Sequence, residues 1–528
     1  MTRNSWRADL LAGVTVGIVA LPLALAFGVS AGAGPEAGVV TAIVAGIVAA
    51  IFGGSHVQVS GPTGAMVVVL GPIIAVHGVT VLGFVGVAAG LLVIVAGIMR
   101  LGRTVSAIPW PVIEGFTAGI AVIIFLQQMP AAFGEPSTGH GSNAAVAAFD
   151  AVAHASGPTA WWSLGLVALV AVASLAIGRL WPRLPATIIA VGLATAIAIM
   201  ADAPVAVIGN LPAGLPAPSL PSFDWSTAGS LAGPVLTVAA LAAIESLLSA
   251  RMIATHSDTG PYDADRELVG QGLASVASAA FGGMPATGAI ARTAVNVRAG
   301  GRSRLAAVSH SVLLLAVVGL GGAFVARIPL PALAGVLMVT AARMVPLKTV
   351  KVVLQSSRQD AVIFWVTAVV TVSVDLVYAV AIGVVVAAFF ALRTLAQSAG
   401  VHREELPGPA SAHDEAIALF RIDGALFFAA ADRVLERVAE IEEASVVVLR
   451  MSQIHLLDAT GAQVLAELVA NLERRGVTVL VKGIQPRHLA LAQRAGVLAS
   501  LSHEHHVFEA LEPAIAHARE HAAHRADH

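Results

Sequence analysis

The first 397 residues form a series of long apolar segments with very little charge, and this feature assigns them to a membrane. They hold 32 of the 62 Lys, Arg, Asp and Glu residues, about 8% of their length. The whole chain is 57% hydrophobic and 12% charged, with a mean hydropathy of +0.84, whereas an average soluble domain carries about 25% charge. This composition excludes an ordinary soluble enzyme, a disordered protein and a nucleic-acid-binding protein.

The remaining residues, 398–528, have the composition of a soluble domain, because they hold the other 30 charged residues, about 23% of their length. We therefore expect a transmembrane domain over 1–397, a linker over 398–413 and an independent domain over 414–528. The sequence contains no cysteine, which excludes disulfides, thiolate catalysis and Cys-ligated metals.

Fourteen segments of the first part are candidate membrane spans, since a span needs about 20 apolar residues, or fewer where it is broken. Their approximate limits are 11–30, 37–53, 61–76, 80–99, 112–129, 161–178, 186–201, 232–254, 267–281, 287–298, 305–325, 330–345, 360–374 and 376–396.

The basic residues between these spans predict the orientation. With the N-terminus in the cytoplasm, almost all of them fall in cytoplasmic connections, and Arg327 is the exception. The same rule places the soluble domain in the cytoplasm. The cytoplasmic set is Arg100, Arg103, Arg179, Arg183, Arg266, Arg302, Arg304, Lys348, Lys351 and Arg358.

Two short motifs recur at nearly the same offset. Ile108–Pro111 resembles Ile328–Pro331 at an offset of 220, and Thr63–Ala65 is repeated as Thr287–Ala289 at an offset of 224. Spans 1–7 and 8–14 would then be two halves. Because seven is odd, the halves have opposite orientations, which is the inverted repeat of many secondary transporters.

Spans 3 and 10 read as broken helices. Each follows a Gly- and Pro-rich segment, Gly53–Pro62 and Phe281–Pro285, and Pro62 and Pro285 suit a helix start. Extended backbone at membrane depth is tolerated only where it is buried in protein or lines a cavity. Two half-helices whose N-termini face each other would bind an anion.

The predicted anion site consists of seven residues from these two segments. Small residues at helix contacts also permit close packing, so packing alone is the alternative for the Thr-Gly pairs. For the arginine, the alternative is a position near the interface beside Arg298, although an intramembrane arginine indicates a functional site by default. The seven residues are Thr63, Gly64, Ala65, Thr287, Gly288, Ala289 and Arg292.

Glu245 lies in the middle of span 8, where every neighbour is apolar except Ser246. A carboxyl group there either binds a proton or holds a sodium ion with nearby hydroxyls. We predict that Glu245 couples a cation to transport; a structural pairing with Arg292 is the alternative. His56 and Glu36 are the next candidates for coupling.

The soluble part predicts a small α/β fold from alternating strand and helix patterns. Asp423-Gly424 has the form of a hairpin turn between strands 417–422 and 425–428. A helix at 431–443, a strand at 445–450, a helix at about 459–473, a strand at 477–481 and two further helices follow.

Two features of this part have competing interpretations. Asp458–Gly461 is more simply a helix cap than an anion or phosphorylation site at Thr460. His517, His521, His524 and His528 share one helical face. We expect a solvated tail there rather than a metal site.

Three regions resemble the SulP family of sulfate permeases and related anion transporters. They are Asp9–Gly13 with Leu21–Ala26, then Ser60–Thr63, and finally Gly288–Asn296 with Gly300. The soluble part resembles a STAS domain through Val448–Arg450 and Asp458–Ala462.

The resemblance implies fourteen spans in a 7+7 inverted repeat, with a core of spans 1–4 and 8–11 and a gate of spans 5–7 and 12–14. It also implies a homodimer with the anion between spans 3 and 10. The chain departs from many family members by having alanine rather than serine at Ala289 and Ala291. An acid at the position of Glu245 serves cation coupling in relatives.

The sequence thus predicts a secondary active transporter of a small anion, of the dicarboxylate, bicarbonate or sulfate class, in the cell inner membrane. Proton-coupled symport by an elevator-like movement of core against gate is favoured. A sodium-coupled symporter and an uncoupled exchanger or channel are the alternatives. An enzyme is not predicted, since the spans hold no metal-ligand cluster, nucleophile triad or phosphate loop. No cofactor, metal or nucleic-acid partner is predicted either.

Overall fold

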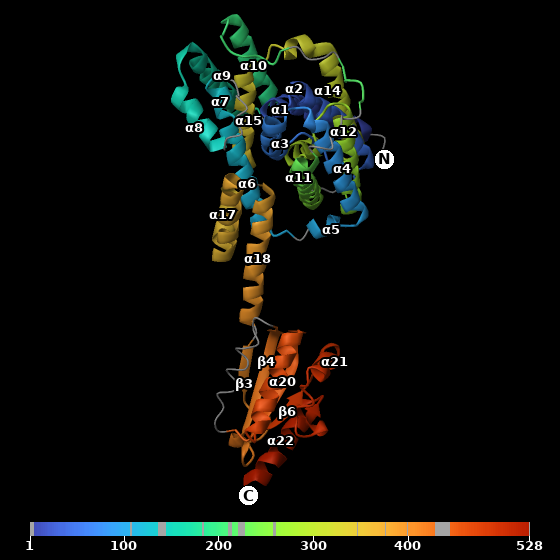
Figure 1. Cartoon of the computed structure of the whole chain (residues 1–528), viewed down its shortest axis with the longest axis vertical. Helices are drawn as coiled ribbons and strands as arrows, with labels where there is room; N and C mark the ends of the chain where they lie inside the picture. Colours follow the sequence, from blue (N-terminus) through green and yellow to red (C-terminus); the bar gives the residue numbers. More distant parts are fainter. Residues whose placement is uncertain are drawn as a thin grey trace. The chain divides into compact units, whose positions relative to one another are not determined.

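The chain consists of two units, a helical one and a smaller α/β one (Figure 1). The computed structural model describes residues 5–105, 108–135, 144–181, 184–209, 214–219, 228–256, 260–345, 347–374, 376–398, 400–427 and 444–526. Residue contacts divide the chain between Val384 and Val385, which lies inside the last predicted span.

Every predicted span falls on a helix. The corresponding helices are α1 (Ser5–Ser30), α2 (Pro35–Phe52), α3 (Gly64–His77), α4 (Val81–Ile98), α6 (Trp110–Gln127), α9 (Gly157–Leu180), α10 (Ala186–Met200), α11 (Ala228–His256), α12 (Ala264–Ala280), α13 (Ile290–Arg298), α14 (Arg304–Val325), α15 (Leu330–Met344), α17 (Arg358–Ser373) and α18 (Leu376–Ser398). Shorter helices lie between them: α5 (Gly102–Val105), α7 (Met129–Ala132), α8 (Ala144–His154) and α16 (Leu347–Ser356).

Within the described residues, nine helical stretches are long and apolar enough to cross a membrane unaided. The two predicted half-helices do not qualify. Helix α3 has 14 residues and α13 has 9, which gives lengths of about 21 Å and about 14 Å against a hydrocarbon core of about 30 Å. The two helices therefore end or begin inside the layer that their neighbours cross.

Close backbone approach holds the helices together. Helix α12 packs against α2 and α4, and α1 packs against α14. At the α4–α12 contact, a Cβ on Gly90 would lie 2.7 Å from the carbonyl oxygen of Gly272. No larger residue fits there, which is the small-residue packing that membrane helices use in place of hydrophobic burial.

The second unit is a five-stranded sheet with helices on both faces. The strand order is β3-β4-β5-β6-β7; β3 is antiparallel to β4 and the other pairs are parallel. The strands are β3 (Gly400–Glu404), β4 (Ile417–Leu426), β5 (Val446–Leu457), β6 (Thr478–Lys482) and β7 (Val507–Phe508). The helices are α20 (Ala459–Arg474), α21 (Pro486–Arg494) and α22 (Leu511–Ala526), and the short 3₁₀ turns are η1 (Asp414–Ala416) and η2 (Glu504–His506).

Alternation along the strands separates the two cores of this unit. Phe420, Val447 and Val479 face α20, whereas Leu419, Val448 and Leu480 face α22 through its alanines. Period-two alternation of this kind is what buries both faces of a strand.

In the soluble part, the structure differs from the sequence prediction at the expected hairpin and at the expected linker. The hairpin at Asp423-Gly424 is wrong: β4 runs through both residues, and the register with β5 shifts there because Gly424, at φ 85°, forms a bulge rather than a turn. The predicted linker 398–413 contains β3, which pairs with β4. The predicted helix 431–443 lies outside the described residues.

Candidate functional site

Two short strands join the two half-helices. Strand β1 (Ser60–Gly61) pairs antiparallel with β2 (Thr287–Gly288), so that Gly61 lies opposite Thr287. Helix α3 then begins at Gly64 with Thr63 as its N-cap, and α13 begins at Ile290 with Ala289 as its N-cap. The predicted starts at Pro62 and Pro285 are therefore early, by two residues and by five, because extended residues precede each helix.

Neither N-cap side chain binds the backbone of its own helix. The amide groups of each first turn are therefore not capped from within, as an anion site at a helix N-terminus requires. The hydroxyl of Thr63 points instead to the opposite half of the site.

The carboxylate of Glu245 brings the two halves together. Its Oε2 atom accepts hydrogen bonds of 2.8 Å from both the Thr63 and the Thr287 hydroxyls. The two hydroxyl oxygens are themselves 2.9 Å apart. The next residue of α11 also takes part, since the Ser246 hydroxyl accepts a 3.0 Å bond from the Gly288 amide.

Arg292 provides the positive charge of the cluster. It is 2% exposed, and its guanidinium donates to the carbonyl of Pro62 at the end of β1. Its Nη1 atom has no hydrogen-bond partner. Arg298, by contrast, is exposed, so Arg292 is enclosed by protein and does not share the exposed position of Arg298.

The alternative pairing of Glu245 with Arg292 is also not seen, because these two described residues form no ion pair. The carboxylate is satisfied by hydroxyls, and one guanidinium nitrogen remains free. A buried cationic nitrogen without a partner is expensive, and a bound anion would supply that partner.

Three positions of the site are occupied by glycine because a larger side chain would clash with its neighbours. A Cβ on Gly288 would lie 1.9 Å from Nε2 of Gln58, and one on Gly61 would lie 2.6 Å from Nη1 of Arg292. A Cβ on Gly64 would lie 2.3 Å from Cδ1 of Ile124 in α6. Ala65 and Ala289 are buried beside them.

Glu267 is a buried carboxylate that the sequence analysis missed. Its Oε2 atom accepts from the amides of Gly54 (2.8 Å) and Ser55 (3.0 Å), and its Oε1 atom accepts from Gln58 Nε2 at 2.8 Å. It thereby fixes the segment that leads into β1. Because Glu267 follows Asp263 and Asp265 at a predicted span end, the sequence pattern resembles a solvated helix start.

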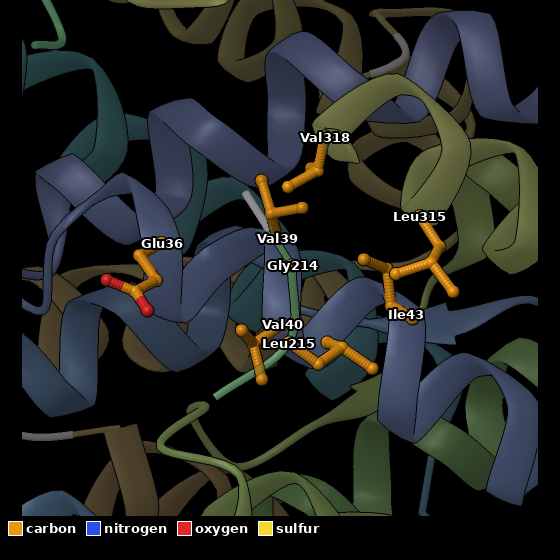
Figure 2. Close-up of a pocket in the computed structure, with 8 residues that line it drawn as sticks. All are labelled: Glu36, Val39, Val40, Ile43, Gly214, Leu215, Leu315 and Val318. Carbon is orange, nitrogen blue, oxygen red and sulfur yellow. The ribbon is translucent and has the colours of Figure 1, made fainter. Parts of the chain in front are cut away.

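His56 and Glu36, the next candidates for cation coupling, lie outside the cluster. His56 is exposed. Glu36 lies in the first turn of α2 and borders a pocket otherwise lined by apolar residues and Gly214, with Val39, Ile43 and Leu315 among them (Figure 2). Neither residue belongs to the hydrogen-bonded cluster around Glu245.

The predicted helix cap at Asp458–Gly461 is confirmed, with Asp458 as the N-cap of α20. The Asp458 Oδ1 atom accepts from the Gly461 amide at 2.7 Å, and Thr460 is exposed. In the C-terminal stripe, His517 and His521 pack their rings against His506 and are half-buried, whereas His528 lies outside the described residues. The expectation of a fully solvated stripe is therefore wrong for these two histidines.

Comparison with known proteins agrees with this architecture. Residues 6–367 match the sulfate permease family and residues 409–514 match the STAS domain. YvdB of Bacillus subtilis, provisionally named a sulfate transporter, is 32% identical over 518 residues, covering 95% of this chain and 96% of YvdB. The bicarbonate transporter BicA of Synechocystis is 30% identical, covering 90% of this chain and 88% of BicA.

The fold is also that of a solved anion transporter. The structure of murine Slc26a9 superposes with a TM-score of 0.84 at 17% identity, covering 98% of this chain and 92% of that one.

A bundle of membrane helices with two half-helices that meet at a buried arginine defines the class as a transport protein. The chain belongs to the sulfate permease family. It is a multi-span anion transporter with a C-terminal STAS domain, and not an enzyme.

Proposed function

We propose that the chain is a secondary active, proton-coupled transporter of a small anion, with Glu245 as the proton-binding residue. The observation that carries this proposal is the pair of hydrogen bonds from Thr63 and Thr287 to one carboxylate oxygen. Each hydroxyl has a single proton to donate. While both donate to Glu245, neither is available to another anion.

Protonation of Glu245 reverses this state. A protonated carboxyl donates one hydrogen bond and no longer requires the two hydroxyl protons, so Thr63 and Thr287 turn toward the bound anion. The negative charge that would repel the anion is removed in the same step. Proton and anion then favour each other's binding reciprocally.

The proposed anion site comprises the seven residues predicted from sequence. Thr63 and Thr287 supply hydroxyls, and Arg292 supplies its free Nη1. Gly64 and Ala65 supply the backbone amides at the start of α3. The amides of Gly288 and Ala289 are already bonded to the Ser246 hydroxyl and the Val59 carbonyl, so these two small residues contribute space rather than donors. A low-dielectric site with a preorganised positive charge binds a small anion without requiring a metal or cofactor.

A sodium ion is the second candidate for coupling. Glu245 and the two threonines place three oxygens within 2.9 Å of each other, and hard cations prefer oxygen ligands. The proton is favoured because it uses the hydrogen bonds already present without adding ligands. An uncoupled exchanger or channel is the remaining alternative.

The proposed movement is a shift of core against gate. Within the core, α12 packs on α2 and α4, and α1 on α14; within the gate, α6 packs on α17, and α9 on α10 and α15. An apolar cavity lies between α1, α14 and α10, lined by Leu21, Val191 and Val317 among others. The apolar lining of this cavity favours sliding of the two bodies, although Gln128 at the end of α6 donates a 2.8 Å hydrogen bond to Ser30 of α1 across the boundary.

The proposed setting is a homodimer in the cell inner membrane with the N-terminus and the STAS domain in the cytoplasm. The support for the orientation is the distribution of basic residues between spans. The substrate proposal, sulfate or bicarbonate, rests on the names of YvdB and BicA. A C4-dicarboxylate stays in the panel because the buried Ala289 offers no hydroxyl to a tetrahedral oxyanion.

The test is uptake into proteoliposomes of labelled sulfate, bicarbonate and a C4-dicarboxylate, with proton and sodium gradients imposed in turn. We expect one anion to accumulate when the proton gradient is imposed. Accumulation only with sodium would transfer the coupling to that ion. Equilibration without accumulation under either gradient would establish the uncoupled alternative.

A further inference from the structure

Three histidines of the STAS domain come together from two separate elements. His506 ends η2, and His517 and His521 lie on successive turns of α22. One ligand nitrogen from each of the three lies within 4.8 Å of the other two. The ring centroids are 5.5 Å (His506–His517), 5.3 Å (His506–His521) and 4.8 Å (His517–His521) apart.

The spacing on α22 is the one that two helical metal ligands need. Residues four apart lie on one face of a helix, one turn above the other, and paired histidines at this spacing hold zinc in metalloproteases. The third imidazole comes from a different element. A metal ion held by all three would link the segment before β7 to α22.

A second observation points to a ligand. His506 is 1% exposed, and its Nδ1 atom has no hydrogen-bond partner. A buried polar nitrogen is unfavourable unless a neighbouring group, a water molecule or an ion provides a hydrogen bond or a coordination bond. The partners that surround it are the rings of His503, His517 and His521, which offer further imidazole nitrogens.

One carboxylate borders the trio. The Oε2 atom of Glu520 lies 3.3 Å from Nδ1 of His517, and a carboxylate on one ring nitrogen leaves the other oriented for a metal. Burial and the neighbouring histidines hold the pKa of His506 below its usual value, and the same causes lower that of His521.

We propose that His506, His517 and His521 form a binding site for one divalent transition-metal ion of the zinc type. Imidazole suits Zn²⁺, Cu²⁺ and Ni²⁺. Zn–N bonds of about 2.0–2.1 Å at tetrahedral angles place ligand nitrogens about 3.3–3.4 Å apart, so rotation of the half-exposed His517 and His521 rings is sufficient to close the site. His503 or a water molecule completes the coordination.

The site binds metal independently of transport, because its ligands belong to the second unit alone. A metal bound only to the folded domain stabilises that domain by mass action. We therefore expect Zn²⁺ to protect α22 and the segment 502–508 against local opening.

The experiment uses the full-length protein in detergent, purified without a histidine tag and stripped with a chelator. Zn²⁺ binding is measured in competition with a chromophoric chelator. We expect one ion per chain, and at least about tenfold weaker binding in His517→Gln and His521→Gln. His524→Gln, on the same helix but outside the trio, is the matched control and should bind as the unmodified chain does.

Hydrogen exchange of residues 502–526 with and without Zn²⁺ gives a second readout. Protection should appear in the unmodified chain and in His524→Gln, and should be absent in His506→Gln and His521→Gln. Since His506 is buried, the two helix variants decide the result if His506→Gln does not fold. Failure of the unmodified chain to retain Zn²⁺, or equal affinity in all variants, would overturn the proposal.

Discussion

The hydroxyl oxygens of Thr63 and Thr287 lie 2.9 Å apart, although 224 positions separate the two residues in the chain. The same offset relates the two Thr-Gly-Ala motifs in the sequence. Equivalent residues of the two motifs therefore meet at one point, and the carboxylate of Glu245 lies there with them.

Glu245→Gln should retain anion binding but lose acceleration by a proton or sodium gradient. The amide keeps the size of the side chain and removes the charge, so it imitates the protonated form permanently. Anion binding and gradient-driven uptake in proteoliposomes measure the two properties separately. Glu245→Ala should be worse, because it leaves a gap and two buried hydroxyls without their acceptor. Normal accumulation with normal cation dependence in Glu245→Gln would make the residue structural.

Thr287→Val should weaken anion binding by about fivefold, since a lost hydrogen bond is worth about 1 kcal/mol. Thr195→Val is the matched control, because Thr195 is equally buried but donates only to Val191 of its own helix. Titration of the anion against both purified variants checks the difference. Equal affinities in the two variants would place the anion elsewhere.

Gly64→Ala should lower the thermal stability of the membrane domain and impair uptake. The added Cβ would lie 2.3 Å from Cδ1 of Ile124, and overpacking costs about 1–3 kcal/mol. Ile124→Val deletes that Cδ1 atom. The double variant should therefore be more stable than the sum of the two single effects predicts. Strict additivity in unfolding temperatures would argue against this contact.

Glu267→Gln should destabilise the segment that leads into β1. A glutamine there accepts from Gly54 and Ser55 with an uncharged oxygen, which is a weaker acceptor. Its NH₂ group faces the NH₂ group of Gln58 until that amide rotates, and rotation leaves the Gln58 NH₂ group buried without a partner. The expected loss is about 1–3 kcal/mol. Gln58→Glu in the same chain restores a donor–acceptor pair and should recover part of the unfolding temperature. Equal stability of both variants and the unmodified chain would contradict this role.

Acid should weaken the attachment of α22 through Asp414. Hydrogen bonds from Arg519 and from the Ser411 amide hold the pKa of Asp414 below its usual 3.8. The folded state therefore gains stability from the ionised carboxylate above pH 3.8 and loses it as pH falls through the lower folded value. Hydrogen exchange of α22 as a function of pH measures this loss. In Asp414→Asn, the hydrogen-exchange rate of α22 should change less over the same pH range.

The sequence predicted the positions of the membrane helices well, because hydrophobic runs of the right length have few other structures available. It also located Thr63, Thr287 and Arg292 at the two half-helices. It placed the start of α13 at Pro285, which is five residues early. In a short apolar segment, the sequence alone does not distinguish residues that pair as a strand from residues that form the first turn of a helix.

Other features depend on tertiary contacts that a pattern does not contain. Glu267 looks like an acid of a solvated helix start, and only the fold brings it to the amides of Gly54 and Ser55. Asp423-Gly424 satisfies the local rule for a turn, but pairing of β4 on both edges keeps the strand extended. His506 precedes α22 and is not part of the helical pattern that aligns His517 with His521, so the histidine cluster was visible only in part.

The pairing of β1 with β2 has a consequence for synthesis. A chain that lengthens by about 5–20 residues per second needs roughly 10–45 s to add the 224 positions between Thr63 and Thr287. During that interval the first half-helix is already made, while its partner strand, Arg292 and Glu245 are still to come. Most of the membrane helices are therefore made before the proposed anion site is complete, so newly made chains pass through a stage in which they lack half of that site.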